Sequence, residues 1–165
     1  MFSIQVFIEN EAHSNRKNLF HEKTLAYQET VTVTGEYPYP YGFILNTAGG
    51  DADNLDCFVL TRKSLKSGQI VECEPIAVLE QTESSWDHPD IQEEDNTILA
   101  RLKAEEEEVP LDAALAARLA DFITHIFDHL PGKKVTVGSL LGREEAVAQI
   151  RQCMDRFQRS RDPEA

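Results

Sequence analysis

Apolar and polar residues alternate along the segment FSIQVFIEN, with Ile4, Val6 and Ile8 on one side of an extended chain. This period of two predicts a β-strand. Residues 11–18 (EAHSNRKN) have no such period and are expected to form a polar loop. Further strands are predicted over residues 24–35, 42–45, 55–61, 96–102 and 133–142, and over residues 70–83 as a strand pair or one strand bent at Pro75.

Helical spacing begins in the C-terminal third of the chain. Residues 110–130 (PLDAALAARLADFITHIFDHL) have apolar residues at steps of three or four, and so do residues 143–160 (REEAVAQIRQCMDRFQRS). The apolar face of the first helix is expected to be Leu115, Leu119, Phe122, Ile126 and Leu130. About five to seven strands followed by two helices predict an α+β fold, with a mainly antiparallel sheet or small barrel and the helices packed at its side.

Length and charge narrow the range of functions. A chain of 165 residues favours one domain, here residues 1–165, with room for a sizeable core. The net charge of −13 disfavours nucleic acid and anionic membranes as partners, and it favours attraction of divalent cations. No apolar run approaches the ~20 residues of a membrane span, and the N-terminus lacks the features of a signal peptide, so a cytoplasmic location is expected.

Three aspartates, Asp51, Asp53 and Asp56, fall within six residues of the segment GGDADNLDCFVL. Asp51 and Asp53 can share one face of an extended or turn-like segment, and Asp56 can converge on them from the start of a strand. Converging carboxylates cannot all stay ionised unless a positive charge lies between them. The pattern therefore indicates either a site for a hard divalent cation such as Mg²⁺ or a polar turn in which aspartates cap the backbone.

The neighbouring segments decide between these alternatives. YPYPYGFI precedes the aspartates, and GQIVECEPIAVLEQTE follows them. In this order the three segments resemble the soluble family I inorganic pyrophosphatases, which carry a Tyr-Pro-x-x-Tyr-Gly-x-Ile segment, a D-x-D-P-x-D signature and a P-x-x-V-L strand. The resemblance covers residues from about 4 to about 157 and implies a small OB-like barrel, Mg²⁺ as cofactor, inorganic diphosphate as substrate and assembly into a homo-oligomer.

The resemblance also implies roles for individual residues. Asp51, Asp56, Glu83 and Asp95 match metal ligands, and Asp87, Asp90 or Glu94 could compete with the last two because of the acidic insertion SSWDHPDIQEED. Asp53 matches the aspartate that accepts a proton from the attacking water. Lys17 and Tyr41 match substrate-binding residues, and Glu9 matches a glutamate near the site.

Several positions depart from the family pattern. Glu29 replaces a phosphate-binding arginine, Thr97 replaces a lysine, and Leu130-Pro131 replaces a Tyr-Lys pair; Leu19 and Asn54 are further departures. Nearby basic residues could substitute for the lost ones, namely Arg16, Arg101, Lys133 or Lys134. The sequence thus favours a diphosphate hydrolase with altered phosphate contacts. The alternative is a metal-binding relative on the same fold that is non-catalytic or has changed specificity.

Overall fold

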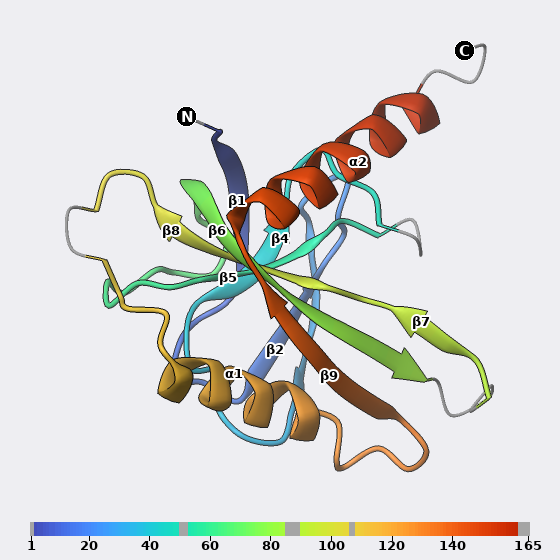
Figure 1. Cartoon of the computed structure of the whole chain (residues 1–165). Coiled ribbons are helices and arrows are strands. Elements are labelled where there is room, and N and C mark those ends of the chain that lie inside the picture. Colours follow the sequence, from blue (N-terminus) through green and yellow to red (C-terminus); the bar gives the residue numbers. More distant parts are fainter. Residues whose placement is uncertain (1, 50–52, 85–89, 106–107, 162–165) are drawn as a thin grey trace.

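The computed structural model describes residues 2–49, 53–84, 90–105 and 108–161, which form a β-rich body with two helices (Figure 1). The strands are β1 (Ile4–Asn10), β2 (Arg16–Phe20), β3 (Tyr27–Thr32), β4 (Tyr41–Ile44), β5 (Asp56–Val59), β6 (Ile70–Ser84), β7 (Gln92–Glu94), β8 (Thr97–Leu102) and β9 (Lys134–Leu141). The helices are α1 (Ala113–His125) and α2 (Arg143–Arg161).

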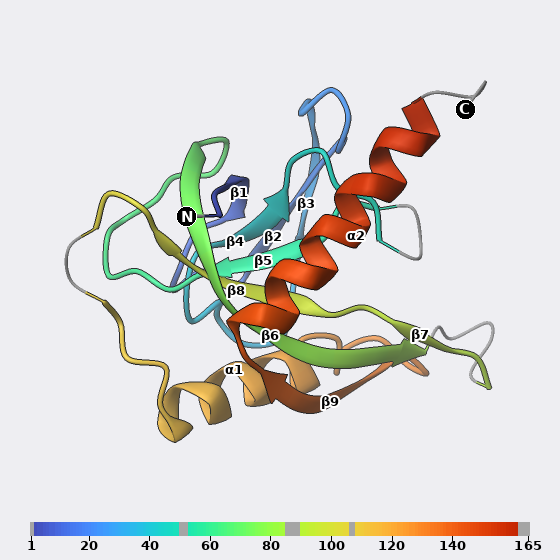
Figure 2. The same ribbon diagram turned by 45° about the horizontal axis from the view of Figure 1, so that its top comes forward.

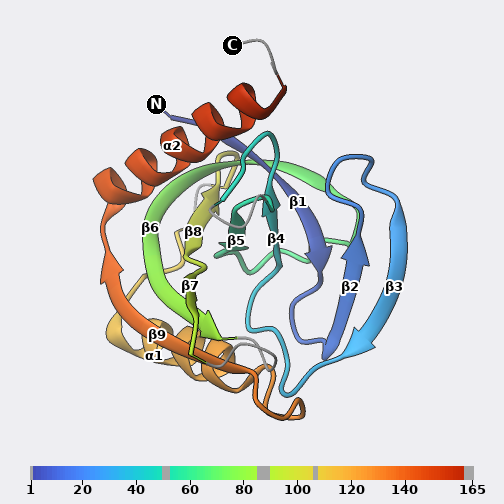
Figure 3. The same cartoon turned by 90° about the vertical axis from the view of Figure 1, so that its right-hand side faces the viewer.

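Five strands close into a ring, which Figure 3 shows from its open end. The order β1-β4-β5-β8-β6 returns to β1, because β6 pairs with β1 through residues 70–73. The pairings in the ring are antiparallel except that of β5 with β8, which is parallel. β7 and β9 pair with the far half of β6 and extend the sheet beyond the ring. The predicted OB-like β-barrel with helices is therefore confirmed.

The long strand β6 takes part in most of these pairings because it bends. The register against β8 shifts between Pro75 and Ala77, so that Pro75 lies opposite Ala100 and Ala77 opposite Leu99. A proline cannot donate to the strand ladder, which explains an irregularity at this point. Of the two forms predicted for residues 70–83, a strand pair or a bent strand, the bent strand is the one observed.

The two helices cover separate apolar clusters. α2 lies across β6 (Figure 2) and buries Ala146, Ile150 and Cys153. α1 packs near β9 and buries Leu115, Leu119 and Phe122 of its predicted face. Asp112 caps α1, since its side chain accepts a hydrogen bond from the Leu115 amide.

The prediction that Leu130 belongs to the apolar face of the first helix is wrong. Leu130 is 43 % exposed, because α1 ends at His125 and the chain turns away before residue 130. Gly132, at φ 81°, adopts the left-handed backbone conformation that completes this turn. None of the helices in the described ranges is both long and apolar enough to cross a membrane.

Two short strands escaped the sequence prediction. Arg16–Phe20 forms β2, within and just beyond the expected polar loop 11–18, and it pairs with β3 in a separate two-stranded sheet. β3 is exposed along its whole length, so neither strand of this hairpin has a fully buried face to impose alternation. β7 lies within the acidic segment before Asp95, and it too is exposed throughout.

Gly42 allows the barrel to close tightly beside the site. It lies in β4 opposite Ile8, and a Cβ atom at this position would overlap the backbone carbonyl oxygen of Phe7. Any larger residue would push β4 away from β1. The glycine of the Tyr41-Gly42 pair therefore keeps Tyr41 in place.

Candidate functional site

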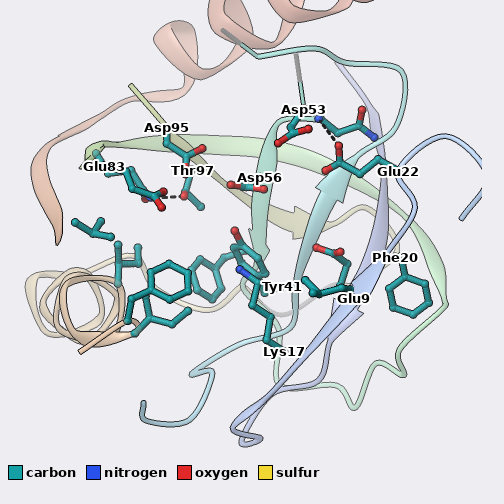
Figure 4. Close-up of a pocket in the computed structure, with 18 of the residues that line it drawn as sticks. Glu9, Lys17, Phe20, Glu22, Tyr41, Asp53, Asp56, Glu83, Asp95 and Thr97 are labelled. Atoms are coloured by element: carbon teal, nitrogen blue, oxygen red, sulfur yellow. Dashed lines mark hydrogen bonds between the residues drawn. The ribbon is translucent and has the colours of Figure 1, made fainter. Parts of the chain in front are cut away.

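A cavity of about 700 Å³ opens between the barrel, the β2–β3 hairpin and α1. Figure 4 shows that the labelled acidic side chains reach it from several elements. Carboxylates outnumber lysines in its lining: the carboxylates are Glu9, Glu22, Asp53, Asp56, Glu83, Glu93, Glu94 and Asp95, and the lysines are Lys17, Lys23 and Lys133. The cavity thus combines strong negative charge with a few cations.

Asp56, at the start of β5, faces Asp95 and Tyr41 across the cavity (Figure 4). Burial raises the pKa of the Asp56 carboxyl well above its usual range, and the negative charge of Asp95 raises it further. Lys17 and a hydrogen bond with Tyr41 oppose this rise in pKa. Burial and the charges of Asp56 and Asp95 raise the pKa of Tyr41, so its hydroxyl remains a hydrogen-bond donor at neutral pH.

Asp53 lies on the rim of the cavity and is exposed. Its loop is held at two points: the Gly49 amide donates to the Asp53 carbonyl at 2.7 Å, and the Asn54 amide donates to Glu22 Oε2 at 3.1 Å. Asp51, the first aspartate of the cluster, lies outside the described residues. The structure therefore brings Asp53 and Asp56 to one cavity, while the position expected for Asp51 stays a prediction.

Glu83 and Asp95, the two acidic residues expected after the P-x-x-V-L strand, both line the cavity. Glu83 Oε1 is paired with Lys133 Nζ at 2.7 Å. The Asp95 amide donates to the Gln81 carbonyl at 3.0 Å, which fixes the chain beside β6.

The three competing carboxylates are placed differently. Glu94 also lines the cavity, and its Oε1 accepts a hydrogen bond from Asn96 Nδ2 at 2.6 Å. Asp90 is exposed and is not among the described residues that line the cavity. Asp87 lies outside the described residues. Glu94 is therefore the described competitor to Glu83 and Asp95.

Lys17 enters the cavity from β2, next to Tyr41 (Figure 4). Its ammonium lies over the ring of Phe127, 4.9 Å from the ring centroid. An aromatic face attracts a cation, so Phe127 helps to hold the Lys17 ammonium in the cavity, where its charge acts on Asp56. Lys17 and Tyr41 are thus both placed to touch a ligand in the cavity.

The positions that depart from the family pattern contribute no positive charge to the described lining of this cavity. Thr97, at the lysine position, is buried, and its hydroxyl donates to Gln81 Oε1 at 2.7 Å. Glu29, Leu130 and Pro131 are not among the described lining residues. Of the four basic residues that could substitute, Lys133 lines the cavity, whereas Arg16, Arg101 and Lys134 are absent from its described lining.

Glu22 was not predicted from the sequence. It lies in the turn of the β2–β3 hairpin and reaches the loop of Asp53 by its bond to the Asn54 amide. Residues 22 and 54 are far apart in the chain, and no local spacing links them. Only the missed strand β2 could have drawn attention to this turn.

Glu9 gives the cavity a pH dependence that can be measured. Burial raises the pKa of Glu9 to about 8, and Glu22 raises it too, against the opposing charge of Lys17. Between the ordinary value of 4.5 and about 8, the folded chain therefore binds more protons at Glu9 than the unfolded chain does. The free energy of unfolding is expected to fall as pH rises through this window.

This trend predicts that Glu9→Gln flattens the pH dependence of stability. Urea unfolding in metal-free buffer at pH 5, 6, 7 and 8 is the measurement. Each pKa unit corresponds to about 1.4 kcal/mol, so the variant should gain up to a few kcal/mol over the wild type at pH 8 and little at pH 5. Glu29→Gln, an exposed carboxylate on β3, is the control. Parallel curves for wild type and Glu9→Gln would contradict the prediction.

The donor set of the cavity suits a hard cation with an open coordination sphere. Within the described part of the chain, no three carboxylate, imidazole or thiol groups are close enough to hold one metal ion. The raised pKa of Asp56 beside Asp95 nevertheless marks a place where a positive charge would be stabilising. Mg²⁺ usually takes one or two carboxylates and completes its shell with water and phosphate oxygens, so the pair fits this ion.

Residues 6–158 match the protein-family model described as inorganic pyrophosphatase. The chain is 31 % identical over 158 residues to an inorganic pyrophosphatase of Thermoplasma volcanium, covering 90 % of this chain and 89 % of that one. Among solved structures, it is similar to an inorganic phosphatase of Anaplasma phagocytophilum (TM-score 0.82, 25 % identity, 94 % of each chain). It is equally similar to an inorganic pyrophosphatase of Neisseria gonorrhoeae (TM-score 0.82, 25 % identity, 94 % of this chain and 91 % of that one).

Proposed function

The chain belongs to the inorganic pyrophosphatase family, and we propose on this premise that it hydrolyses inorganic diphosphate to two phosphate ions with the help of Mg²⁺. The observation that carries the proposal is the shared cavity of Asp53, Asp56, Glu83, Asp95, Lys17 and Tyr41. These residues come from separate segments of the sequence. Their meeting in one cavity supports a common role.

We propose that Asp51, Asp56, Glu83 and Asp95 hold Mg²⁺. Bound Mg²⁺ would neutralise the charge of the diphosphate and make a water molecule more acidic. Asp56 and Asp95 oppose each other across the cavity, and burial together with the negative charge of Asp95 makes the ionised form of Asp56 unfavourable without a cation. An acidic protein can bind an anion in this way, because the local field is reversed at the metal site.

The side chains of the chain itself would move the proton and hold the substrate. Water attacks one phosphorus atom, Asp53 accepts a proton from this water, and the bond from that phosphorus to the bridging oxygen breaks. The second phosphate leaves with the electron pair of that bond. Lys17 and the Tyr41 hydroxyl would donate hydrogen bonds to phosphate oxygens, whose negative charge grows as the bond breaks.

Release of phosphate from diphosphate tests this function directly. Purified wild-type protein with millimolar Mg²⁺ should release phosphate well above the uncatalysed background, and a chelator should abolish the release. Absence of release with Mg²⁺ would contradict the proposal. The same result, combined with stabilisation by Mg²⁺ in thermal melting, would favour the alternative of a metal-binding relative, to which the loss of charge at Thr97, Leu130 and Pro131 points.

Three expectations from the sequence stay predictions: that residues 1–165 form one domain, that the protein is cytoplasmic, and that it forms a homo-oligomer. Size-exclusion chromatography with light scattering would measure the last.

A further inference from the structure

The turn between α1 and β9 lacks a lysine at the position where the family has one, but it carries another lysine, Lys133, three residues after Leu130. Leu130-Pro131 stands where the family has a Tyr-Lys pair, and neither residue is among the described lining of the cavity. Gly132, at φ 81°, then reverses the chain, and Lys133 follows immediately before β9. Lys133 is half-buried and lines the cavity, whereas its neighbour Lys134 is exposed and is not among the described lining residues.

The ammonium of Lys133 is held on two sides. It lies 2.7 Å from Glu83 Oε1 and 4.0 Å from the centroid of the Phe127 ring. Lys17 lies over the same ring at 4.9 Å. The two ammonium groups are therefore less than about 9 Å apart, by the lengths of these two contacts through one ring centroid. Both lysines also line the same cavity, so a polyanion with two phosphate groups bound there can reach both.

Lys133 retains donors for such an anion. An ammonium group has three N–H donors, and Glu83 can take one of them. Two cations beside one ring repel each other, and a dianionic group between them would remove this repulsion. Charge-assisted hydrogen bonds to phosphate are among the strong ones in proteins, so this contact should matter for affinity.

We propose that Lys133 is a substrate-binding residue that contacts a phosphate group of diphosphate opposite Lys17 and takes over the role left open by Thr97, Leu130 and Pro131. The proposal rests on the proposed function, because it assigns a residue to the same cavity. It also distinguishes Lys133 from Arg16, Arg101 and Lys134, the other basic residues near the lost positions. Arg101, for instance, is engaged with Glu108 and the Glu105 carbonyl.

The test is the affinity for methylenediphosphonate, an analogue of diphosphate that is not hydrolysed, measured by titration calorimetry with Mg²⁺ present. Lys133→Met keeps most of the side-chain length and can still pack against the Phe127 ring, but it removes the charge. It should raise the Kd by about 10-fold to 100-fold, as expected for a hydrogen bond to a charged group. Lys134→Met, the adjacent exposed lysine, should stay within about twofold of wild type, and Lys133→Arg should recover part of the loss.

Thermal melting and the Mg²⁺ affinity of each variant separate contact with substrate from a structural effect of the Glu83 pair. The proposal requires a weaker phosphonate affinity in Lys133→Met without a matching loss of Mg²⁺ affinity. Equal weakening by Lys133→Met and Lys134→Met would overturn it, because the cause would then be the overall charge of the chain. An unchanged Kd in Lys133→Met would overturn it as well.

Labelling of the wild-type protein keeps the test independent of how the variants fold. An amine-acetylating reagent, read by mass spectrometry, should modify Lys133 less when methylenediphosphonate saturates the protein, and Lys134 equally with and without it. Unaltered labelling of Lys133 would overturn the proposal. Failure of this test alongside phosphate release would refute only the role of Lys133, and protection of Lys133 without phosphate release would refute only the hydrolase.

Discussion

Replacing Asp53 with asparagine is expected to lower the kcat of phosphate release from diphosphate by about 10²-fold to 10⁴-fold, the usual contribution of a general base. The amide has nearly the same shape as the carboxylate but cannot take a proton from the attacking water. Asp53 is exposed on the rim of the cavity, so the substitution should leave the fold intact. The loss should appear in kcat more than in KM, because the proton moves only as the reaction proceeds.

Initial rates with Mg²⁺ over a range of diphosphate concentrations measure this effect. Asp155→Asn is a matched control, since Asp155 is an exposed aspartate on α2 and is not among the described residues of the cavity. A loss of less than tenfold in Asp53→Asn would mean that another group accepts the proton. Glu22, which holds the same loop through the Asn54 amide, would be the next residue to test.

The strands and helices that the sequence predicted are those whose burial leaves a pattern of apolar residues within their own segment. β1 and α1 each bury one set of regularly spaced apolar residues, so their sequences show the period of the element, whereas β8 is buried on both faces and shows a short continuous apolar run. β2 and β3 form an exposed hairpin without a fully buried side, so nothing in their order of apolar residues distinguishes β2 from a loop. Leu130 continued the helical spacing but lies beyond the point where the chain turns away.

The residues of the site likewise fall into those that the sequence predicted from local segments and those that depend on how distant segments fold together. Asp53, Asp56, Glu83 and Asp95 stand at fixed offsets from recognisable segments, and the structure places all four on one cavity. Glu22 lies in a hairpin turn that folds over the aspartate loop from a distant part of the chain. Lys133 was one of four basic residues that could compensate for the lost ones. Its place in the described lining of the cavity, which spacing does not reveal, distinguishes it from the others.

Because Asp56 and Asp95 bring negative charge to one cavity, we expect Mg²⁺ to stabilise the folded protein and a substitution of Asp56 to remove most of this effect. In wild-type protein, Mg²⁺ should raise the melting temperature, because an ion that binds only the folded state stabilises it by about 2.7 kcal/mol at 100 times its Kd. For a chain of this size, 1 kcal/mol corresponds to about 2–4 °C, so an increase of about 5–10 °C is expected. Asp56→Asn should lose most of this increase.

The same variant should be more stable than the wild type when metal is absent. Burial and Asp95 raise the pKa of Asp56, so the wild-type carboxyl resists ionisation in the folded state and the free energy of unfolding falls as pH rises above its ordinary value of 3.8. Asparagine has no proton to lose, and its oxygen can still accept a hydrogen bond from Tyr41. The gain in melting temperature should therefore be small at pH 4 and larger at pH 8.

Thermal melts of wild type, Asp56→Asn and Asp155→Asn, with chelator and with Mg²⁺ at both pH values, measure the two effects together. Asp155→Asn should follow the wild type in all four conditions. The decisive pattern is that Asp56→Asn melts at a higher temperature than the wild type in chelator, and that Mg²⁺ raises its melting temperature much less than that of the wild type. A carboxylate that only caps a turn would make Asp56→Asn less stable in chelator and would leave the Mg²⁺ response unchanged, which would contradict the assignment of Asp56 as a ligand.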